Sequence, residues 1–521
     1  MTEPVITKKT SLDKDLKKIV RLEQATQESG QRFVKVGLSV LFLVAVWIFA
    51  SMQTGAIDNS AYIVAAGIIG GYMALNIGAN DVANNVGPAV GSKALTMMGA
   101  LLIAAVFESS GAILAGGDVI KTIKGGIIDP SLMPNTQVFI WAMMAALLAA
   151  ALWLNLATYV GAPVSTTHSI VGGVMGAGIA ATGFDAVNWS TMSKIAASWV
   201  ISPLMGGVIA ALFLAFLKYT VLNQKDKVAA ARRWVPVVVG IMGAAFAMYL
   251  VMKGLKKVIK VDTLSVMIIG AVAYVAIYFI VKIYVDKKSA TMENRKRSVN
   301  QLFVIPLICS AALLSFAHGA NDVANAVGPL AAIVSASTSG DIAAKVGIPL
   351  WVMLVGAAGI SAGLVMFGPK LIRTVGEKIT KLNPVRAFCV ALAASITVII
   401  ASTLGLPVSS THIAVGGVFG VGLYREFISN RKRQLVKPSA LGANNGVQLS
   451  GTVSDIVGGA VEEADEMLME LQAKKIKKSA KRKLVRRQHI TTIATAWVVT
   501  VPAAALLAAL LFKAMQAANA G

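Results

Sequence analysis

Charged residues are scarce in this chain. Asp, Glu, Lys and Arg make up 14% of its 521 residues, whereas 56% are hydrophobic. A soluble protein of this length needs far more charged surface, so the shortage excludes an ordinary water-soluble globule. The mean hydropathy is +0.71, and apolar stretches of roughly 18 to 25 residues, each about long enough to cross a bilayer as a helix, recur throughout. The lipid bilayer is the expected solvent.

Cysteine and acidic residues are also few. The two cysteines, Cys309 and Cys389, lie inside apolar runs, which excludes a disulfide framework and favours small buried side chains. There are 25 acidic residues against 48 basic ones, for a net charge of +23. The basic residues stand in short loops and in one long segment near the C-terminus, as the positive-inside rule describes. Membrane lipids are therefore the expected partner, and nucleic acid is not.

The apolar runs predict an all-α polytopic protein of the inner or plasma membrane, with about 12–13 transmembrane helices. Candidate spans begin near residues 33, 59, 95, 137, 163, 190, 234, 263, 302, 347, 386, 407 and 491. The first run follows a polar lead too long for a cleaved signal, so it is predicted to be retained. The runs at Pro163 and Pro407 are short and rich in glycine, and they either span or re-enter.

Stretches rich in Lys and Arg set the expected topology: residues 8–35, 218–233, 282–297 and 425–487. Placing each in the cytoplasm requires an even number of spans between neighbours, and the predicted spans give six, two and four. The N-terminus is then inside and the C-terminus outside. The loop with Lys253, Lys256, Lys257 and Lys260 falls on the outer face, against the rule. The polar segment at 425–490 is predicted to be cytoplasmic, as a connector or a regulatory element.

Two motifs occur twice. Residues 76–88, N-I-G-A-N-D-V-A-N-N-V-G-P, return 241 positions later as A-H-G-A-N-D-V-A-N-A-V-G-P. Residues 161–174, G-A-P-V-S-T-T-H-S-I-V-G-G-V, return 244 positions later as G-L-P-V-S-S-T-H-I-A-V-G-G-V. This repeated order indicates an internal duplication. By the span count the helix leading into Asn80 runs inward and the helix leading into Asn321 runs outward. The halves are therefore predicted to be inverted repeats, a plan typical of secondary transporters.

The duplication divides the chain into predicted units. These are a basic N-terminus with an extra first helix at 1–58, repeat 1 at 59–217, a linker with two transmembrane helices at 218–301, repeat 2 at 302–424, the charged cytoplasmic segment at 425–490 and a final helix at 491–521.

Each copy of the first motif carries one carboxylate, Asp81 or Asp322, and carboxylates in apolar helices are functional by default. Side-chain amides surround them: Asn80, Asn84 and Asn85, and Asn321 and Asn325. Such clustered oxygens suit a hard cation such as Na⁺. Gly78, Gly319 and the Gly-Pro pairs at 87–88 and 328–329 are expected to interrupt the helices and free backbone carbonyls as further ligands. The alternative is an ordinary Asn/Asp cap beside a kink.

The second motif has the pattern of a helix start, with Pro, then hydroxyl residues, then a Gly-rich apolar run. Two helix N-termini, one from each half, could grip a tetrahedral oxyanion from opposite sides. The candidate anion-binding residues are Ser165, Thr166, Thr167, Ser409, Ser410 and Thr411. The alternative is capping with small-residue packing at Gly172/Gly176 and Gly416/Gly420. No Lys or Arg lies inside the four motifs, so a bound multivalent anion needs co-bound cations.

The paired G-A-N-D-V-A-N and P-V-S-[ST]-T-H motifs resemble the inorganic phosphate transporter (PiT) family over about residues 61–424. The resemblance implies a cation:phosphate symporter, not an enzyme, with no cofactor beyond the co-transported ion. Cations would lie at the Asp81 and Asp322 clusters and phosphate at the hydroxyl residues. The intact second N-D motif is similar to the sodium-coupled branch, and a proton-coupled or metal-phosphate symporter is the alternative.

Other residues are candidates for coupling: Glu108, Asn85, His168 and His412. Glu108, in F-E-S-S-G-A, resembles a glutamate of that family, but its counterpart in the second half is Ile360. It is either a proton or cation site or a structural residue.

Three other functions compete with phosphate symport. A sulfate permease would use the same hydroxyls and helix termini. An intramembrane hydrolase with a triad of Ser165, His168 and Asp81 would need its nucleophile once, whereas every element here is doubled. An anion channel is disfavoured because paired carboxylates would repel the permeating ion. A homodimer is compatible with the sequence, which does not set the oligomeric state.

Overall fold

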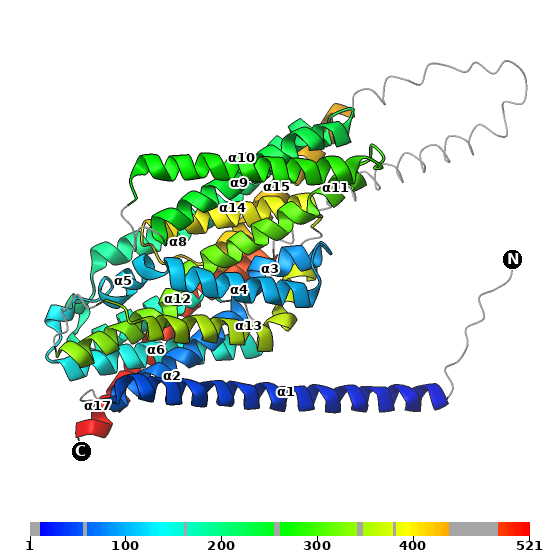
Figure 1. Ribbon diagram of the computed structural model, residues 1–521. Helices are drawn as coiled ribbons and strands as arrows, with labels where there is room; N and C mark the ends of the chain where they lie inside the picture. The colour runs from blue at the N-terminus through cyan, green and yellow to red at the C-terminus, as the bar shows by residue number, and fades with distance from the viewer. Residues whose placement is uncertain are drawn as a thin grey trace, which may run out of the picture.

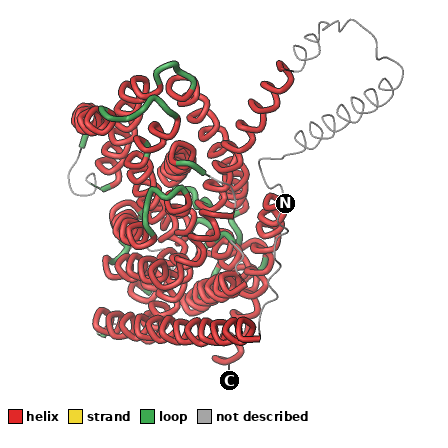
Figure 2. The backbone as a smooth tube through the Cα atoms, turned by 90° about the vertical axis from the view of Figure 1, so that its right-hand side faces the viewer, coloured by secondary structure: helices red, strands yellow, loops and turns green. Residues whose placement is uncertain are grey.

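The computed structural model describes residues 11–55, 60–160, 164–254, 261–340, 347–378, 382–436 and 488–520. Within these ranges the chain is helical, and its only β pairing is an isolated antiparallel bridge between Ile128 and Val187. Helices joined by short loops make up nearly everything that Figure 2 draws in colour. The predicted all-α class is confirmed.

The helices follow one another as in Figure 1. Their bounds are α1 Ser11–Thr54, α2 Ser60–Asn80, α3 Val82–Gly91, α4 Met97–Ala115, α5 Gly117–Gly125, α6 Thr136–Val160, α7 Thr166–Thr182, α8 Trp189–Leu217, α9 Lys227–Lys253, α10 Thr263–Ser289, α11 Lys296–Leu302, α12 Val304–Ser339, α13 Leu350–Lys378, α14 Pro384–Thr403, α15 Ser410–Val436 and α17 Gln488–Ala520. Short helical turns lie at Pro130–Leu132 and Phe184–Ala186, and a π-helical turn at Lys218–Leu222 ends α8.

Eleven helical segments in the described chain are long and apolar enough to cross a membrane. Two predicted spans, those beginning at Pro163 and Pro407, correspond to α7 and α15, which are not among the eleven. Every other predicted span has its own segment. The chain is a multi-pass membrane protein, as its composition predicted.

Burial separates the centre of the bundle from its rim. In Figure 1, α12 lies in the middle, with α1 along one edge and α10 along the opposite edge. The most apolar stretch of α12 is 78% buried, whereas those of α1 and α10 are each 11% buried. Apolar helices exposed on this scale suit contact with lipid.

The helices that carry the N-D motifs are antiparallel. In the middle of α2, Gly70 lies against the side chain of Leu330, late in α12. At the end of α2, Asp81 lies beside Asp322, which is earlier in α12. Residue numbers therefore rise along one helix as they fall along the other, which confirms the predicted inversion of the two halves.

The two halves are interlocked, because each motif helix packs on a helix of the other half. Gly78 of α2 lies against the Ile360 backbone of α13, and Gly319 of α12 lies against the Glu108 backbone of α4. These contacts are related by the duplication, since Gly78 matches Gly319 and Ile360 matches Glu108. A Cβ atom at either glycine would overlap a backbone carbonyl oxygen. Only glycine allows such a close approach of two backbones.

The last helix, α17, packs on the half to which it does not belong in sequence. Gly172 and Gly176 of α7 lie against the α17 backbone at Val501 and Ala505. In the other half, Gly416 and Gly420 of α15 lie against the α8 backbone at Pro203 and Gly207. The G-x-x-x-G spacing thus serves close helix packing in both halves. The last helix, which the sequence division set apart from repeat 2, thus packs on α7 as α8 packs on α15.

The short helix α5 supports the loop before α15. Its Thr122 hydroxyl donates to the carbonyl oxygen of Gly405 at 2.7 Å, and Gly405 has φ +69°. The Asp118 carboxylate of α5 pairs with the Lys253 ammonium at 2.5 Å. Partial burial would raise the pKa of Asp118, but the hydrogen bond and charge of Lys253 outweigh it and lower that pKa below its usual value. One lysine of the predicted outer basic loop is therefore paired.

Candidate functional site

The two predicted carboxylates meet in the centre of the bundle. Asp81 lies at the junction of α2 and α3, Asp322 lies within α12, and both are buried. Ligand atoms of Asp81, Asp322 and His318 lie within 4.8 Å of one another. Sequence reasoning placed one carboxylate cluster in each half, and the fold joins the two clusters at the repeat interface.

Asp81 binds hydroxyl groups from both halves. Its Oδ2 accepts a hydrogen bond from Thr166 of α7 at 2.6 Å, and its Oδ1 accepts one from Thr411 of α15 at 2.9 Å. Asp322 has the matching contact with Ser410 of α15, at 3.3 Å. The predicted cation and anion residues are thus in direct contact.

The asparagines three residues after each aspartate extend this network. Asn84 donates to the Thr411 hydroxyl at 2.8 Å. Its counterpart Asn325 donates to Thr166 and Thr167, each at 3.2 Å. The side-chain oxygen of Asn325 is buried and has no hydrogen-bond partner among the described residues. It is therefore open to a cation ligand role.

The asparagines that precede each aspartate bind the end of the preceding helix, and Asn321 also binds the loop before α15. Asn80 donates to Thr158 at 3.2 Å, and Asn321 donates to the matching Ser402 at 2.9 Å. The Asn321 carbonyl oxygen also accepts from the Val408 N–H at 3.3 Å. The Asn321 contacts fix the entry to the second hydroxyl motif, a positioning task that the sequence had not suggested for this amide.

The predicted helix starts are confirmed, with the hydroxyls divided between two tasks. Ser165 caps α7 by accepting the His168 N–H at 3.1 Å, and Ser409 accepts the His412 N–H at 3.3 Å. The Thr167 hydroxyl donates to the Val408 carbonyl oxygen at 3.0 Å, across the two halves. Capping accounts for the serines at 165 and 409 but not for the threonines that reach Asp81.

The expectation that both motif helices are interrupted is correct for the first half and wrong for the second. The helix breaks at Asp81, between α2 and α3, whereas α12 runs without a break through Gly319, Asp322 and Pro329. Close packing at the motif glycine does not explain the difference, because Gly78 packs as closely on α13 as Gly319 does on α4. Proline still removes one helical hydrogen bond in each half, because Pro88 and Pro329 have no N–H to donate four residues back. Those carbonyls belong to Asn84 and Asn325.

Sequence reasoning missed His318. Its Nδ1 lies 2.5 Å from Glu108 Oε2 and its Nε2 lies 2.9 Å from Asp322 Oδ2, with all three side chains buried. Asn85 donates to the other Glu108 oxygen at 2.7 Å. A signal was available, because His318 is four residues before Asp322 on a helix and replaces Ile77 of the first copy.

The two motif histidines meet where the halves join. The rings of His168 and His412 are 4.9 Å apart, and His168 also lies 3.9 Å from the Trp199 ring of α8. The Trp199 indole donates to the Pro407 carbonyl oxygen at 3.2 Å. The oxygens of Asp81 are bonded to threonines rather than to His168, so the triad of the hydrolase alternative is not assembled.

No lysine or arginine is among the buried polar residues of the described chain. The centre of the site therefore combines two aspartates with hydroxyl and amide groups. A buried carboxylate pair whose one basic neighbour, His318, is shared with Glu108 attracts cations, and two helix N-termini beside it offer N–H groups to an anion. The arrangement can hold cation and oxyanion next to each other.

Comparison with known proteins agrees with this chemistry. Residues 77–508 match the model of the "Phosphate transporter family". A Helicobacter pylori (strain J99) protein named "Putative phosphate permease" is 48% identical, over 96% of this chain and 98% of its own length. A Pyrococcus abyssi protein with a name of the same form is 37% identical, over 77% of this chain and 98% of its own. A solved structure described as "The sodium-dependent phosphate transporter" is similar with a TM-score of 0.72 and 33% identity, over 88% of this chain and 99% of that one.

Proposed function

Because the chain belongs to the phosphate transporter family, whose members are transporters and not enzymes, we propose that it imports inorganic phosphate by symport with sodium. One observation carries the proposal. Asp81 and Asp322, from inverted halves, converge with the hydroxyl-bearing N-termini of α7 and α15, and no buried Lys or Arg of the described chain balances them. Such a site gains from binding a cation and an oxyanion together.

Sodium would bind beside the aspartates. The ligands that support this assignment are the carboxylates, the side chains of Asn84 and Asn325, and the backbone carbonyls that Pro88 and Pro329 leave without a helical donor. Asn80 would act mainly by holding the end of α6, and Asn321 by holding the end of α14 and the loop before α15. Hard cations favour this set of oxygen ligands.

Phosphate would bind at the start of α7 and α15, against the hydroxyls at 165–167 and 409–411. Two helix N-termini favour an anion through their free N–H groups and their dipoles. The Thr166 and Thr411 hydroxyl hydrogens now point to Asp81. A sodium ion on Asp81 would repel those hydrogens and turn them toward the anion. Sodium binding would thereby create phosphate donors, which is a direct route to coupling.

The inverted architecture supports alternating access. Both halves contribute equivalent groups to one central site, and transporters with inverted repeats open such a site to each side in turn. The likeness to a structure named as sodium-dependent supports sodium over proton as the coupling ion.

The test is uptake of radiolabelled phosphate into proteoliposomes that contain the purified chain. An inward sodium gradient should drive accumulation, and replacing sodium with choline at constant pH should abolish it. Excess sulfate should not compete. Uptake that depends on an imposed pH gradient but not on sodium would mean that the coupling ion is the proton. Complete competition by sulfate would mean that the substrate is not phosphate alone.

A further inference from the structure

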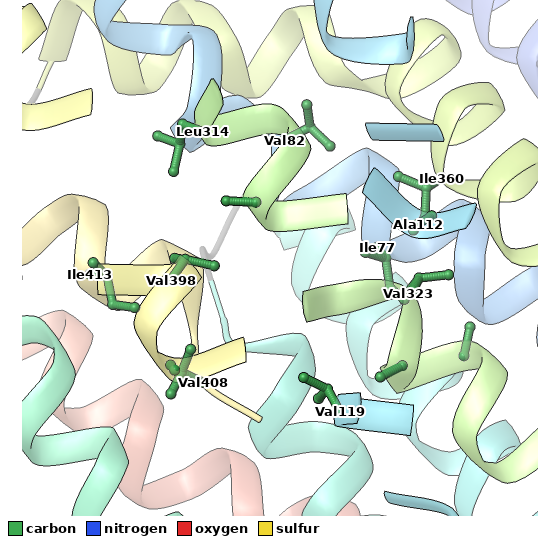
Figure 3. Packing of buried hydrophobic residues seen from close by; sticks show 14 of the residues in the cluster. Ile77, Val82, Ala112, Val119, Leu314, Val323, Ile360, Val398, Val408 and Ile413 are labelled. Carbon is green, nitrogen blue, oxygen red and sulfur yellow. The ribbon is translucent and has the colours of Figure 1, made fainter. Parts of the chain in front are cut away.

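The two aspartate sites differ at one pair of positions. His318 lies beside Asp322 and pairs with Glu108 of the first half, and both side chains are buried and polar. The duplication matches these positions to Ile77 and Ile360, which are both fully buried in the apolar core. Figure 3 shows Ile77 and Ile360 among those apolar side chains. The backbones at the two pairs pack alike, with Gly78 against Ile360 and Gly319 against Glu108.

His318 is locked in place by a chain of contacts. Asn85 donates to Glu108 Oε1 at 2.7 Å, and Glu108 Oε2 lies 2.5 Å from His318 Nδ1. The other ring nitrogen lies 2.9 Å from Asp322 Oδ2, an ion-pair distance without the geometry of a straight hydrogen bond. A nitrogen lone pair that close to a carboxylate oxygen would be repulsive, so Nε2 carries a proton. The ring cannot turn away without losing Glu108.

The donors around Asp81 are of another kind. Its two oxygens accept only hydroxyl hydrogens, from Thr166 and Thr411. A hydroxyl can rotate and present its oxygen to a cation, because it is both donor and acceptor. The protonated nitrogen of His318 can only donate, so it competes with any cation for Asp322 Oδ2. The remaining oxygen, Asp322 Oδ1, has no hydrogen-bond partner among the described residues.

We propose that Glu108 and His318 make the two aspartate sites unequal, so that sodium binds tightly at Asp81 and more weakly at Asp322. His318 acts through Asp322 as a positioning residue, and Glu108 acts through His318. This inference rests on the proposed sodium symport and adds an order of binding to it. The first half takes its sodium ion first, and the second half completes the site.

The decisive variant gives the Asp322 site the apolar pair that stands at the Asp81 site. In Glu108→Ile/His318→Ile, the buried pair becomes the one that the fold already accommodates at Ile360 and Ile77. Binding of radioactive sodium to purified protein is then measured against sodium concentration, with choline holding the ionic strength constant. For the unaltered chain we expect a sodium-binding curve with two steps, one for each aspartate site. In the variant the weaker binding step should move to a roughly tenfold or more lower sodium concentration, while the tighter step keeps its sodium concentration. This factor is the one expected when a hydrogen-bond donor that competes for a charged group is removed.

Single aspartate variants show which aspartate binds sodium in each step, and they leave Glu108 and His318 unchanged. Asp81→Asn should remove the tight step, and Asp322→Asn should remove the weak step. A merely structural role of His318 would leave the weak step of the double variants at its original sodium concentration. For a variant that fails to fold, Glu108→Gln/His318→Gln provides neutral side chains of similar length and should move the weak step in the same direction.

Each result has a distinct meaning. Two steps of equal affinity, or loss of the tight step in Asp322→Asn, would overturn the inference and leave sodium symport standing. An unmoved weak step in both double variants would also overturn it. Absence of any sodium binding in the unaltered chain would overturn the proposed function, and the inference with it.

Discussion

The Asp81 carboxylate accepts a hydrogen bond of 2.9 Å from the Thr411 hydroxyl, 330 positions further along the chain. The two residues belong to opposite halves of an inverted duplication. The same aspartate also binds Thr166 of its own half, so one carboxylate holds the starts of both hydroxyl-bearing helices. A substitution at Asp81 therefore removes a contact from the start of both α7 and α15.

Replacing either central aspartate should disable transport. Asp81→Asn and Asp322→Asn each remove a cation-attracting charge while keeping the side-chain shape. Sodium-driven phosphate uptake in proteoliposomes should fall roughly 10- to 150-fold, the scale of losing an interaction with a charged group. Asp185→Asn, at an exposed turn, is the control and should leave uptake unchanged. Uptake at the unaltered rate in either central variant would remove that aspartate from the mechanism.

Phosphate and sodium should strengthen each other's binding. With no buried Lys or Arg in the described chain, bound phosphate depends on cations beside it. Replacing part of the sodium with choline should raise the apparent KM for phosphate. Linkage requires that phosphate tighten sodium binding by the same factor, roughly 5- to 150-fold for ordinary coupling energies. Equilibrium binding measured in both directions checks this equality, with pH varied separately. A phosphate affinity that follows pH but not sodium would favour the proton-coupled alternative.

Glycine at the crossing of α4 and α12 should be essential for stability. A Cβ atom at Gly319 would overlap the backbone carbonyl of Glu108, so Gly319→Ala forces the helices apart. Overpacking of this kind costs about 1–3 kcal/mol. The variant should melt at a lower temperature in detergent. Gly125→Ala is the matched control, because nothing lies within 4 Å of a Cβ atom there. Equal melting temperatures for the two variants would show that the helices separate freely.

Trp199 should tune phosphate affinity. Its indole N–H holds the Pro407 carbonyl just before the hydroxyl motif, and Trp199→Phe removes that donor while keeping an aromatic ring on His168. The KM for phosphate should rise roughly 2- to 10-fold, as for a lost neutral hydrogen bond, with little change in maximal rate. Trp189→Phe loses an indole–carbonyl hydrogen bond of the same 3.2 Å length away from the site and should not change KM. A similar KM in both variants would contradict this assignment.

The segment at 439–483 should be dispensable for transport. It lies outside the described residues, and its sequence offers few apolar groups for packing on the bundle. Deleting it and joining the ends with a flexible linker should leave the phosphate KM unchanged, measured in the same uptake assay. Loss of phosphate binding in a correctly inserted deletion variant would give the segment a role at the site.

Much of this architecture follows from the sequence alone. Apolar runs predict membrane helices because each run must satisfy its backbone within itself in lipid. The duplication, the inversion of the halves and the helix starts at Thr166 and Ser410 were also predictable, since repeated motifs, basic loops and capping residues are local patterns. The repeated motifs also identified Asp81, Asp322 and the hydroxyl residues as candidate binding residues without any knowledge of their contacts.

Tertiary packing decided which candidates meet. Nothing near Asp81 in the sequence points to Thr411, and Glu108 and His318 are separated by 210 positions. The unbroken course of α12 through Asp322 was not predictable, because its motif residues are nearly those of the first copy, which breaks at Asp81. The exchange of α8 and α17 between the halves depends on glycine seams. Such pairings are set by which helix surfaces fit each other, and a linear pattern carries no record of that fit between distant segments.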